Sequence, residues 1–214
     1  MRTIMTLNPK GGCGKTTIAV NTASFFAAAG NKVVLADLDA QQSSLAWLHA
    51  RGDERAEIIG LDARQKTLRP PRDSDILIVD APAAVHGSAL TKLVQKADTL
   101  VIPVLPSPID MRACAHFIEE LLTASKISRR QTKLAVVANR VRGNTLIYQS
   151  LEAFLQKLKI PFVATLRDSQ NYIRAAERGL GIFELAPSAV SVDKEQWKPL
   201  LRWLRSKRSQ PETG

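Results

Sequence analysis

The stretch NPKGGCGKTT, from Asn8 to Thr17, decides the fold of this chain. It separates a short apolar run, RTIMTLN at 2–8, from a helical pattern, TTIAVNTASFFAAAG at 16–30. A glycine-rich loop between a strand and a helix can wrap its backbone N–H groups around phosphate oxygens at the helix N-terminus. The stretch therefore predicts a phosphate-binding loop in an α/β protein.

Pro9 and Lys10 distinguish this loop from the usual G-x-x-x-x-G-K-[ST] pattern. Lys15 and Thr16 end the stretch as that pattern requires, whereas Pro9 replaces its first glycine and Lys10 precedes the remaining glycines. Lys15 would neutralise charge on the β- and γ-phosphates, and the Thr16 hydroxyl would bind Mg²⁺. Lys10 has no role within the usual pattern, so its presence needs a separate explanation.

Strand-like and helix-like runs alternate along the rest of the chain. Strand-like runs lie at 32–37, 75–82, 99–105 and 133–140, and they are followed by helical patterns at 43–50, 87–97, 110–125 and 145–158. Unbroken apolar runs are typical of strands buried on both faces, and their alternation with helices builds a mostly parallel sheet. We predict a single doubly wound α/β domain over 1–214, with Gly30 capping the first helix and a polar basic tail from about 206. Pro103, Pro106 and Pro108 are expected to end the strand at 99–105.

Composition limits the class of protein and the kind of partner. The chain has 214 residues, of which 45% are hydrophobic and 23% charged, as expected for one packed domain. Cys13 and Cys114 offer neither a disulfide framework nor a metal-ligand spacing, and no signal peptide or membrane-length apolar stretch is present. We therefore expect a cytoplasmic protein. The formal net charge of +10 favours a polyanionic partner, either nucleic acid or an anionic membrane surface.

Acidic residues follow two of the expected strands. Asp37 and Asp39 come at the end of VVLADLDAQ, and Asp80 ends the run ILIVD. A single acid at a strand end is often a cap for the next helix. Because the carboxyl ends of parallel strands share one edge of the sheet, these acids are expected to meet the phosphate loop there. Asp80 would hold the hydration shell of Mg²⁺.

These stretches, with VVANRV at 136–141 and TLRDSQNYIRAAERGLGIFE at 165–184, resemble the ParA/MinD-type deviant Walker-A ATPases over nearly the whole chain. The resemblance implies a P-loop NTPase fold with ATP and Mg²⁺ as ligands. It also explains Lys10, because the matching lysine in that family reaches the phosphates bound by the partner subunit of an ATP-bound homodimer. ATP is favoured over GTP because no N-K-x-D sequence is present.

The resemblance implies a role for each matching residue. Lys10, Lys15 and Asp39 would be catalytic, with Asp39 positioning the attacking water, and Asp37 would act with Asp80 through the waters around Mg²⁺. Asn139 and Arg140 match the positions that recognise the base. The nucleotide-binding set is then Lys10, Gly11, Gly12, Cys13, Gly14, Lys15, Thr16, Thr17, Asn139 and Arg140, with Cys13 as a small filler. Ala40 departs from the family, which often has proline there.

The function implied is that of a small ParA-like partition ATPase. An ATP-bound dimer would bind nonspecific DNA on the nucleoid, and a ParB-like adaptor would stimulate slow hydrolysis to release it. A plasmid is the expected cargo, and carboxysomes or chemosensory clusters are the alternatives. A MinD-like membrane-associated protein and a metabolic ligase of the dethiobiotin-synthetase type are the rival interpretations. The nitrogenase iron-protein branch lacks its paired cysteines here.

The stretch DKEQWKPLLRWLRSKR, at 193–208, bears on the choice between DNA and membrane. Trp197, Leu200, Leu201 and Leu204 recur at helical spacing beside a basic stripe. The apolar face could lie on lipid, but no linker precedes it, so we expect it to pack on the sheet and to leave the basic stripe outside. The predicted DNA-binding residues are Arg167, Lys198, Arg202, Arg205, Lys207 and Arg208. Other basic residues, at 63–74 and at Arg129, Arg130 and Lys133, are expected to be solvated surface charges.

Overall fold

A computed structural model describes residues 1–63, 69–123, 132–143, 145–158 and 160–212. Its seven strands form one sheet in the order β3-β2-β4-β1-β5-β6-β7, and every described strand pair is parallel. The strands are β1 (Arg2–Thr6), β2 (Val33–Asp37), β3 (Ile58–Asp62), β4 (Ile76–Asp80), β5 (Thr99–Val104), β6 (Lys133–Val141) and β7 (Phe162–Arg167). The predicted doubly wound α/β fold is confirmed. Arg129, Arg130 and part of the loop at 63–74 lie outside the described residues.

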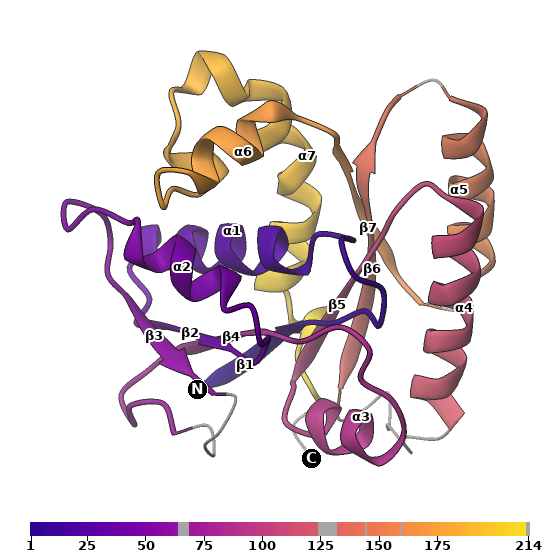
Figure 1. The fold of residues 1–214 in the computed structure, drawn as a ribbon, viewed down its shortest axis with the longest axis horizontal. Coiled ribbons are helices and arrows are strands. Elements are labelled where there is room, and N and C mark those ends of the chain that lie inside the picture. The colour runs from indigo at the N-terminus through magenta and orange to yellow at the C-terminus, as the bar shows by residue number, and fades with distance from the viewer. Residues whose placement is uncertain (64–68, 124–131, 144, 159, 213–214) are drawn as a thin grey trace.

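Helices cover both faces of this sheet (Figure 1). The helices are α1 (Lys15–Ala28), α2 (Ser43–His49), α3 (Gly87–Val94), α4 (Pro108–Thr123), α5 (Leu146–Lys157), α6 (Gln170–Ala176) and α7 (Pro187–Arg205), with short 3₁₀ turns η1 (Ile182–Glu184) and η2 (Lys207–Ser209). One core packs α3, α4 and α5 on the sheet, and the other packs α1, α2, η1 and α7 on the opposite face. Neighbouring strand residues separate accordingly, since Met5 belongs to the first core and Ile4 to the second.

The two edge strands, β3 and β7, were not among the predicted strands. In β3 only Ile58 is buried, and in β7 buried and half-buried residues alternate. An edge strand is covered less completely than a central one, so its sequence lacks the long apolar run that marked the other strands. Pro103 was expected to end its strand, but it lies inside β5. The carbonyl group of Pro103 accepts a hydrogen bond from the Asn8 side chain, beyond the last residue of β5 that pairs with β1. On the other side of β5, Pro103 stays in register with Val137 of β6.

Helix α7 packs on the sheet as predicted. Trp197, Leu200, Leu201 and Leu204 are all buried in the core beside α1, and Trp203 is half-buried at its margin. Phe183 joins this core by edge-on ring contacts with Phe25 and Trp197. No described helix is both long enough and apolar enough to cross a membrane. The apolar side of α7 therefore belongs to the interior of the domain.

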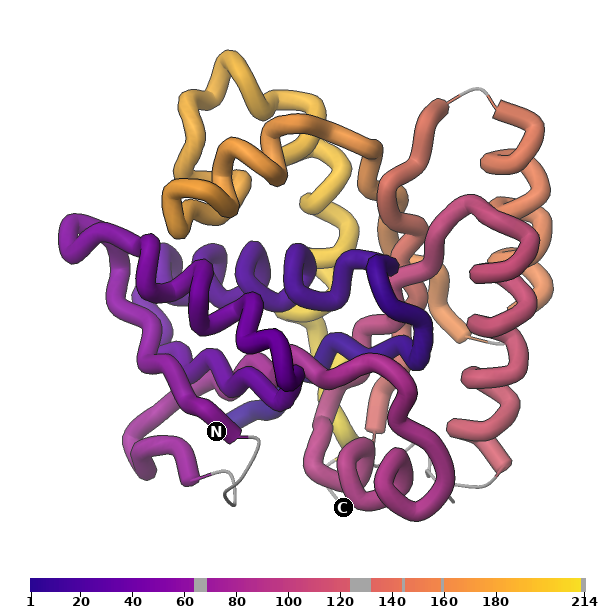
Figure 2. The backbone as a smooth tube through the Cα atoms, in the orientation of Figure 1, coloured from indigo at the N-terminus to yellow at the C-terminus, as the bar shows by residue number. Residues whose placement is uncertain are grey.

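Arg2 and the 3₁₀ turn η2 lie together at the amino edge of the sheet, in the lower half of Figure 2. Arg2 donates hydrogen bonds to the Leu204 carbonyl group and to both oxygens of Ser209. The Thr99 hydroxyl also donates to the Ser209 carbonyl oxygen, at 2.5 Å. The predicted polar tail from about 206 is therefore fastened to the domain through Ser209.

Candidate nucleotide-binding site

The glycine-rich loop joins β1 to α1 as the sequence predicted. Gly12 and Gly14 have φ angles of 74° and 94°, a region that side chains with a Cβ atom adopt poorly. A Cβ atom at Gly14 would lie 2.1 Å from Nδ2 of Asn139, so this position also excludes a side chain by contact. The loop leads directly into the N-terminus of α1, where free backbone N–H groups favour an anion.

Lys15 is folded back against its own loop. Its ammonium group donates to the Lys10 carbonyl oxygen at 3.0 Å, and only 7% of the residue is exposed. The Cys13 thiol donates to the same carbonyl oxygen, and burial raises the pKa of this thiol. A buried protonated thiol is a poor nucleophile, which agrees with the prediction of Cys13 as a small filler.

A pocket of about 650 Å³ lies between this loop and the ends of two other strands. Its lining comprises Gly11, Gly12, Gly14, Lys15, Thr16, Thr17, Asp39, Ala40, Gln41, Ser43, Pro82 and Ala83. The expected meeting of the β1, β2 and β4 ends is therefore present. Gln41, Ser43, Pro82 and Ala83 were not among the predicted site residues, although they lie in or beside the acidic stretches at the ends of β2 and β4. These residues shape the wall of the pocket, and a role of this kind cannot be recognised from residue type.

Asp80 and Thr16 form the polar floor beside the loop. The Thr16 hydroxyl donates to Oδ2 of Asp80 at 2.7 Å, and only 1% of Asp80 is exposed. Burial raises the pKa of Asp80 to about 7, and the nearby Asp37 charge adds to this rise, while the Thr16 hydrogen bond opposes it. A buried carboxylate with this pKa would be stabilised by a cation.

The donor set of this floor fits Mg²⁺ held together with a nucleotide. One carboxylate and one hydroxyl oxygen are hard ligands, and Mg²⁺ usually binds one or two such groups while waters and substrate phosphates complete its shell. The described residues contain no cluster of three or more His, Cys, Asp or Glu side chains that could hold a metal by themselves. This arrangement suits a metal that arrives with its substrate.

The other two acids have different surroundings. Oδ2 of the fully buried Asp37 accepts hydrogen bonds from the Ser44 hydroxyl and backbone N–H groups and from the Leu45 N–H group, and its Oδ1 accepts from the Asp39 N–H group. Asp37 thus caps α2, the alternative role noted for a strand-end acid. Asp39 is half-buried in the pocket wall, where Oδ1 accepts from the Gln41 N–H group at 2.9 Å. Its Oδ2 has no hydrogen-bond partner among the described residues.

The remaining predicted site residues lie around the loop and differ in exposure and in hydrogen-bond partners. Lys10 is exposed, and its ammonium group has no partner in the described part of the chain. The Asn139 amide is buried and donates to the Cys13 carbonyl oxygen at 2.8 Å, so in this structure it supports the loop. Arg140 is exposed with a φ angle of 52° and pairs with Asp168. Only one N–H of the Asn139 amide is used in this contact.

The predicted DNA-binding residues divide into paired and exposed groups. Arg167 makes a bidentate ion pair with the buried Asp193, at 2.7 and 3.0 Å, and Lys198 pairs with Glu195 on the surface. Arg202, Arg205, Lys207 and Arg208 are exposed. A hollow beside them is lined by Phe25, Lys198, Leu201, Arg202, Arg205 and Ser206. This end of α7 adjoins the amino edge of the sheet through the Arg2–Leu204 contact, whereas the nucleotide pocket lies at the carboxyl edge.

Comparison with known proteins agrees with this geometry. A family model described as the CobQ/CobB/MinD/ParA nucleotide binding domain matches residues 4–182. The maintenance of carboxysome distribution protein A of Gloeobacter kilaueensis is 35% identical over 193 residues, which cover 86% of this chain and 84% of that protein.

Two solved structures share the fold. Apo McdA of Cyanothece has a TM-score of 0.74 at 18% identity, covering 94% of this chain and 99% of its own. A crystal structure named for a plasmid partition protein of Borrelia burgdorferi, bound to AMPPNP, has a TM-score of 0.73 at 15% identity, covering 94% of this chain and 98% of its own. At such low identities these two matches show the fold alone.

Proposed function

Because the chain belongs to the family of CobQ/CobB/MinD/ParA nucleotide-binding domains, we propose that it is a cargo-positioning ATPase of the ParA type. On this proposal it binds ATP with Mg²⁺, dimerises, associates with nonspecific DNA as the dimer, and leaves the DNA when a ParB-like adaptor stimulates hydrolysis. The observation that carries the proposal is the pocket in which Lys15, Thr16 and Asp39 face one space.

The pocket suggests a chemical task for each of these residues. Backbone N–H groups of the loop and the Lys15 ammonium group would hold the phosphates, and Lys15 would leave the Lys10 carbonyl oxygen to do so. When bound through Thr16 and the waters around Asp80, Mg²⁺ would neutralise phosphate charge. The open Oδ2 atom of Asp39 would accept a hydrogen bond from the attacking water and orient it.

Exposed groups around the pocket support a dimer across this face. Ile109, Leu146 and Ile173, with 61%, 81% and 52% exposure, stand near the N-termini of α4, α5 and α6. Helices that follow parallel strands begin at the carboxyl edge of the sheet, so these apolar residues share that edge with the nucleotide pocket. Lys10 extends from the same edge without a partner of its own among the described residues. A second copy facing this edge would cover the apolar groups and receive the lysine.

The basic end of α7 supports DNA as the polyanion. Arg202, Arg205, Lys207 and Arg208 are exposed at the opposite edge of the sheet from the pocket. A dimer formed through the pocket would leave both copies of this surface free. Trp197, Leu200, Leu201 and Leu204 of α7 pack in the core and are therefore not available for lipid, which speaks against the MinD-like alternative.

Two cargoes have support from specific observations. A plasmid follows from the sequence resemblance to partition ATPases. A protein compartment is favoured by the carboxysome-distribution relative at 35% identity. Deletion of the gene separates them, since plasmid loss per generation would rise in the first case and compartments would cluster in the second.

The proposal is tested first by binding and turnover. Purified protein is mixed with nonspecific duplex DNA or with anionic liposomes, in ATP, ADP or no nucleotide, across a salt series. We expect ATP-dependent, salt-sensitive DNA binding, together with slow hydrolysis that Asp39→Ala reduces by roughly a hundredfold or more without preventing ATP binding. Liposome binding without DNA binding would overturn the DNA-bound mode. Equal hydrolysis by Asp39→Ala and wild type would overturn the role of Asp39.

A further inference from the structure

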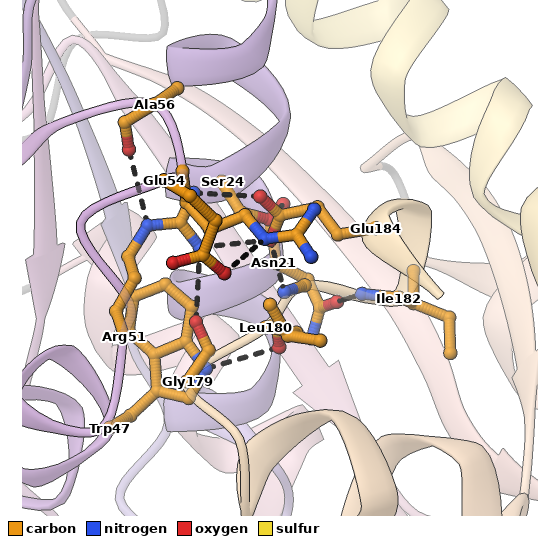
Figure 3. Close-up of polar contacts among 12 residues, drawn as sticks. Asn21, Ser24, Trp47, Arg51, Glu54, Ala56, Gly179, Leu180, Ile182 and Glu184 are labelled. Atoms are coloured by element: carbon orange, nitrogen blue, oxygen red, sulfur yellow. Dashed lines mark hydrogen bonds and ion pairs between the residues drawn. The ribbon is translucent and has the colours of Figure 1, made fainter. Parts of the chain in front are cut away.

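A buried polar cluster joins the end of α2 to the segment at 179–184 (Figure 3). Arg51 donates to both carboxylate oxygens of Glu184, at 2.7 and 2.9 Å, and to the Gly179 carbonyl oxygen at 3.0 Å. The two side chains of this ion pair are only 4% and 9% exposed. One turn earlier in α2, the Trp47 indole N–H group donates to the Leu180 carbonyl oxygen. The end of α2 is therefore fastened by side chains that water reaches poorly.

The backbone of this segment fits closely against α1 and α2. Gly179 has a φ angle of 61°, and a Cβ atom there would lie 2.3 Å from the backbone nitrogen of Arg51. A Cβ atom at Gly181 would lie 1.8 Å from the Ser24 hydroxyl oxygen in α1. Asn21 of α1 also accepts a hydrogen bond from the Ile182 N–H group at 2.6 Å. The RGLGIFE stretch of the sequence thus forms a fixed support on which α2 ends.

The opposite end of α2 is attached to the candidate active site. Asp37, the last residue of β2, accepts the N–H groups of Ser44 and Leu45 in the first turn of the helix. Asp39 lies in the five-residue connection between β2 and α2, and its own N–H group donates a hydrogen bond to Asp37. The place of Asp39 in the pocket therefore depends on where α2 begins.

Helix α2 cannot hold this position by itself. It has seven residues, and isolated helices of fewer than about 12–15 residues are marginal in water. Its N-cap position is occupied by Gln42 with a φ angle of 51°, a conformation that costs energy for a residue with a side chain. The contacts at the two ends of α2 must therefore supply the stability that so short a helix lacks.

We propose that Arg51 and Glu184 are positioning residues for ATP hydrolysis, which fix α2 and thereby hold Asp39 against the pocket. The inference rests on the proposed role of Asp39, but the anchoring of α2 can be measured without it. A misplacement of about 1 Å can cost roughly a hundredfold in rate, so loss of the anchor is expected to reduce turnover more than nucleotide binding.

The chain offers a closely matched control for this test. Asp193 is a second buried carboxylate that receives a bidentate arginine, from Arg167, and one further N–H donor, from Asn171. It ties β7 and α6 to α7 and makes no contact with α2 among the described hydrogen bonds. Glu184→Gln and Asp193→Asn therefore remove the same chemical group from two bidentate ion pairs, of which only one supports α2. The arginine of the control pair is the more exposed, at 37% for Arg167 against 4% for Arg51.

The experiment compares hydrogen exchange and steady-state hydrolysis in these two variants. In Glu184→Gln we expect exchange of the amides at 38–49 to rise by about tenfold or more relative to those in α4, whereas in Asp193→Asn the same ratio stays within about threefold. For hydrolysis, kcat of Glu184→Gln should fall by about tenfold or more, with KM for ATP within about threefold of wild type. Arg51→Lys, which keeps the charge but loses the fork, should give an intermediate result and covers the case in which Glu184→Gln does not fold.

The possible outcomes separate this inference from the proposed function. Unchanged exchange at 38–49 in Glu184→Gln and in Arg51→Lys would overturn the anchor, whatever the hydrolysis rates. Faster exchange with kcat equal to that of Asp193→Asn would show that α2 moves without affecting Asp39, and would overturn the positioning role. If exchange rises but Asp39→Ala hydrolyses ATP like wild type, the anchor stands and the proposed role of Asp39 is wrong.

Discussion

Asp80 provides a direct test of the electrostatics of the pocket, because its burial makes the protein less stable as the pH rises. The change to examine is Asp80→Asn, which keeps the shape of the side chain and an oxygen that can accept the Thr16 hydrogen bond. Burial raises the pKa of this carboxyl from 3.8 to about 7. Between these two values the folded protein holds a proton that the unfolded chain has released.

The sign and size follow from this difference. A folded state that binds more protons than the unfolded state loses stability as pH increases, so the loss begins near pH 4 and is complete above pH 7. A rise of about 3 in the pKa corresponds to roughly 4 kcal/mol in all, and about 3 kcal/mol of this falls between pH 5 and pH 8. The amide of the Asp80→Asn variant does not titrate, so the stability of this variant relative to wild type should rise by about 3 kcal/mol over that range.

Urea unfolding of both proteins at pH 5, 6, 7 and 8, without nucleotide and in the presence of EDTA, measures this directly. The difference in unfolding free energy between the variant and wild type is plotted against pH, so that titrations common to both proteins cancel. A difference that stays constant within about 0.5 kcal/mol, the order of the extrapolation error, would refute the reasoning. It would mean that Asp80 keeps its charge in the folded protein.

Three further substitutions test other parts of the molecule. Gly14→Ala should lower stability by about 2–3 kcal/mol and abolish ATP binding, because the new methyl group would contact Asn139 and the backbone conformation disfavours alanine. Urea unfolding measures the first effect, and nucleotide titration measures the second. Lys10→Ala should leave stability within about 0.5 kcal/mol of wild type and preserve ATP binding, but it should prevent the ATP-dependent dimer. Light scattering detects the dimer, and a normal dimer would contradict the role of Lys10 in the partner subunit's site. Arg202→Glu with Arg205→Glu should weaken DNA binding and reduce the slope of log K against log salt by about 2, with no change of slope if these residues are not at the interface.

The fold was predictable because its determinants are local. Central strands such as β4 and β5 are buried on both faces, so each carries an unbroken apolar run, and the strand-loop-helix order around Gly14 and Lys15 specifies the phosphate loop. The edge strands β3 and β7 escaped prediction because their apolar runs are short: Gly60 interrupts IIGLD, and Thr165 and Arg167 interrupt and end FVATLR.

The candidate site was predictable in its residue types but only partly in its contacts. The strand ends that carry Asp37, Asp39 and Asp80 could be placed at one edge from the parallel order alone. That Asp37 would be saturated by the first turn of α2, while Asp39 keeps an open oxygen, depends on the path of a short loop. A sequence shows two similar acids, and only the folded backbone gives them different partners.

By itself the sequence determined the α/β class, the phosphate loop and the acids at the strand ends, because these follow from periodicity and from the chemistry of neighbouring residues. The tertiary structure decided which charges remain available. It paired Arg167 with Asp193 and Arg51 with Glu184, residues that are 26 and 133 positions apart in the chain, and it left Lys10, Arg202 and Arg205 exposed. The physical reason is that a side chain's charge is screened or neutralised by whatever folding brings beside it, and such contacts between distant segments leave no mark in local sequence.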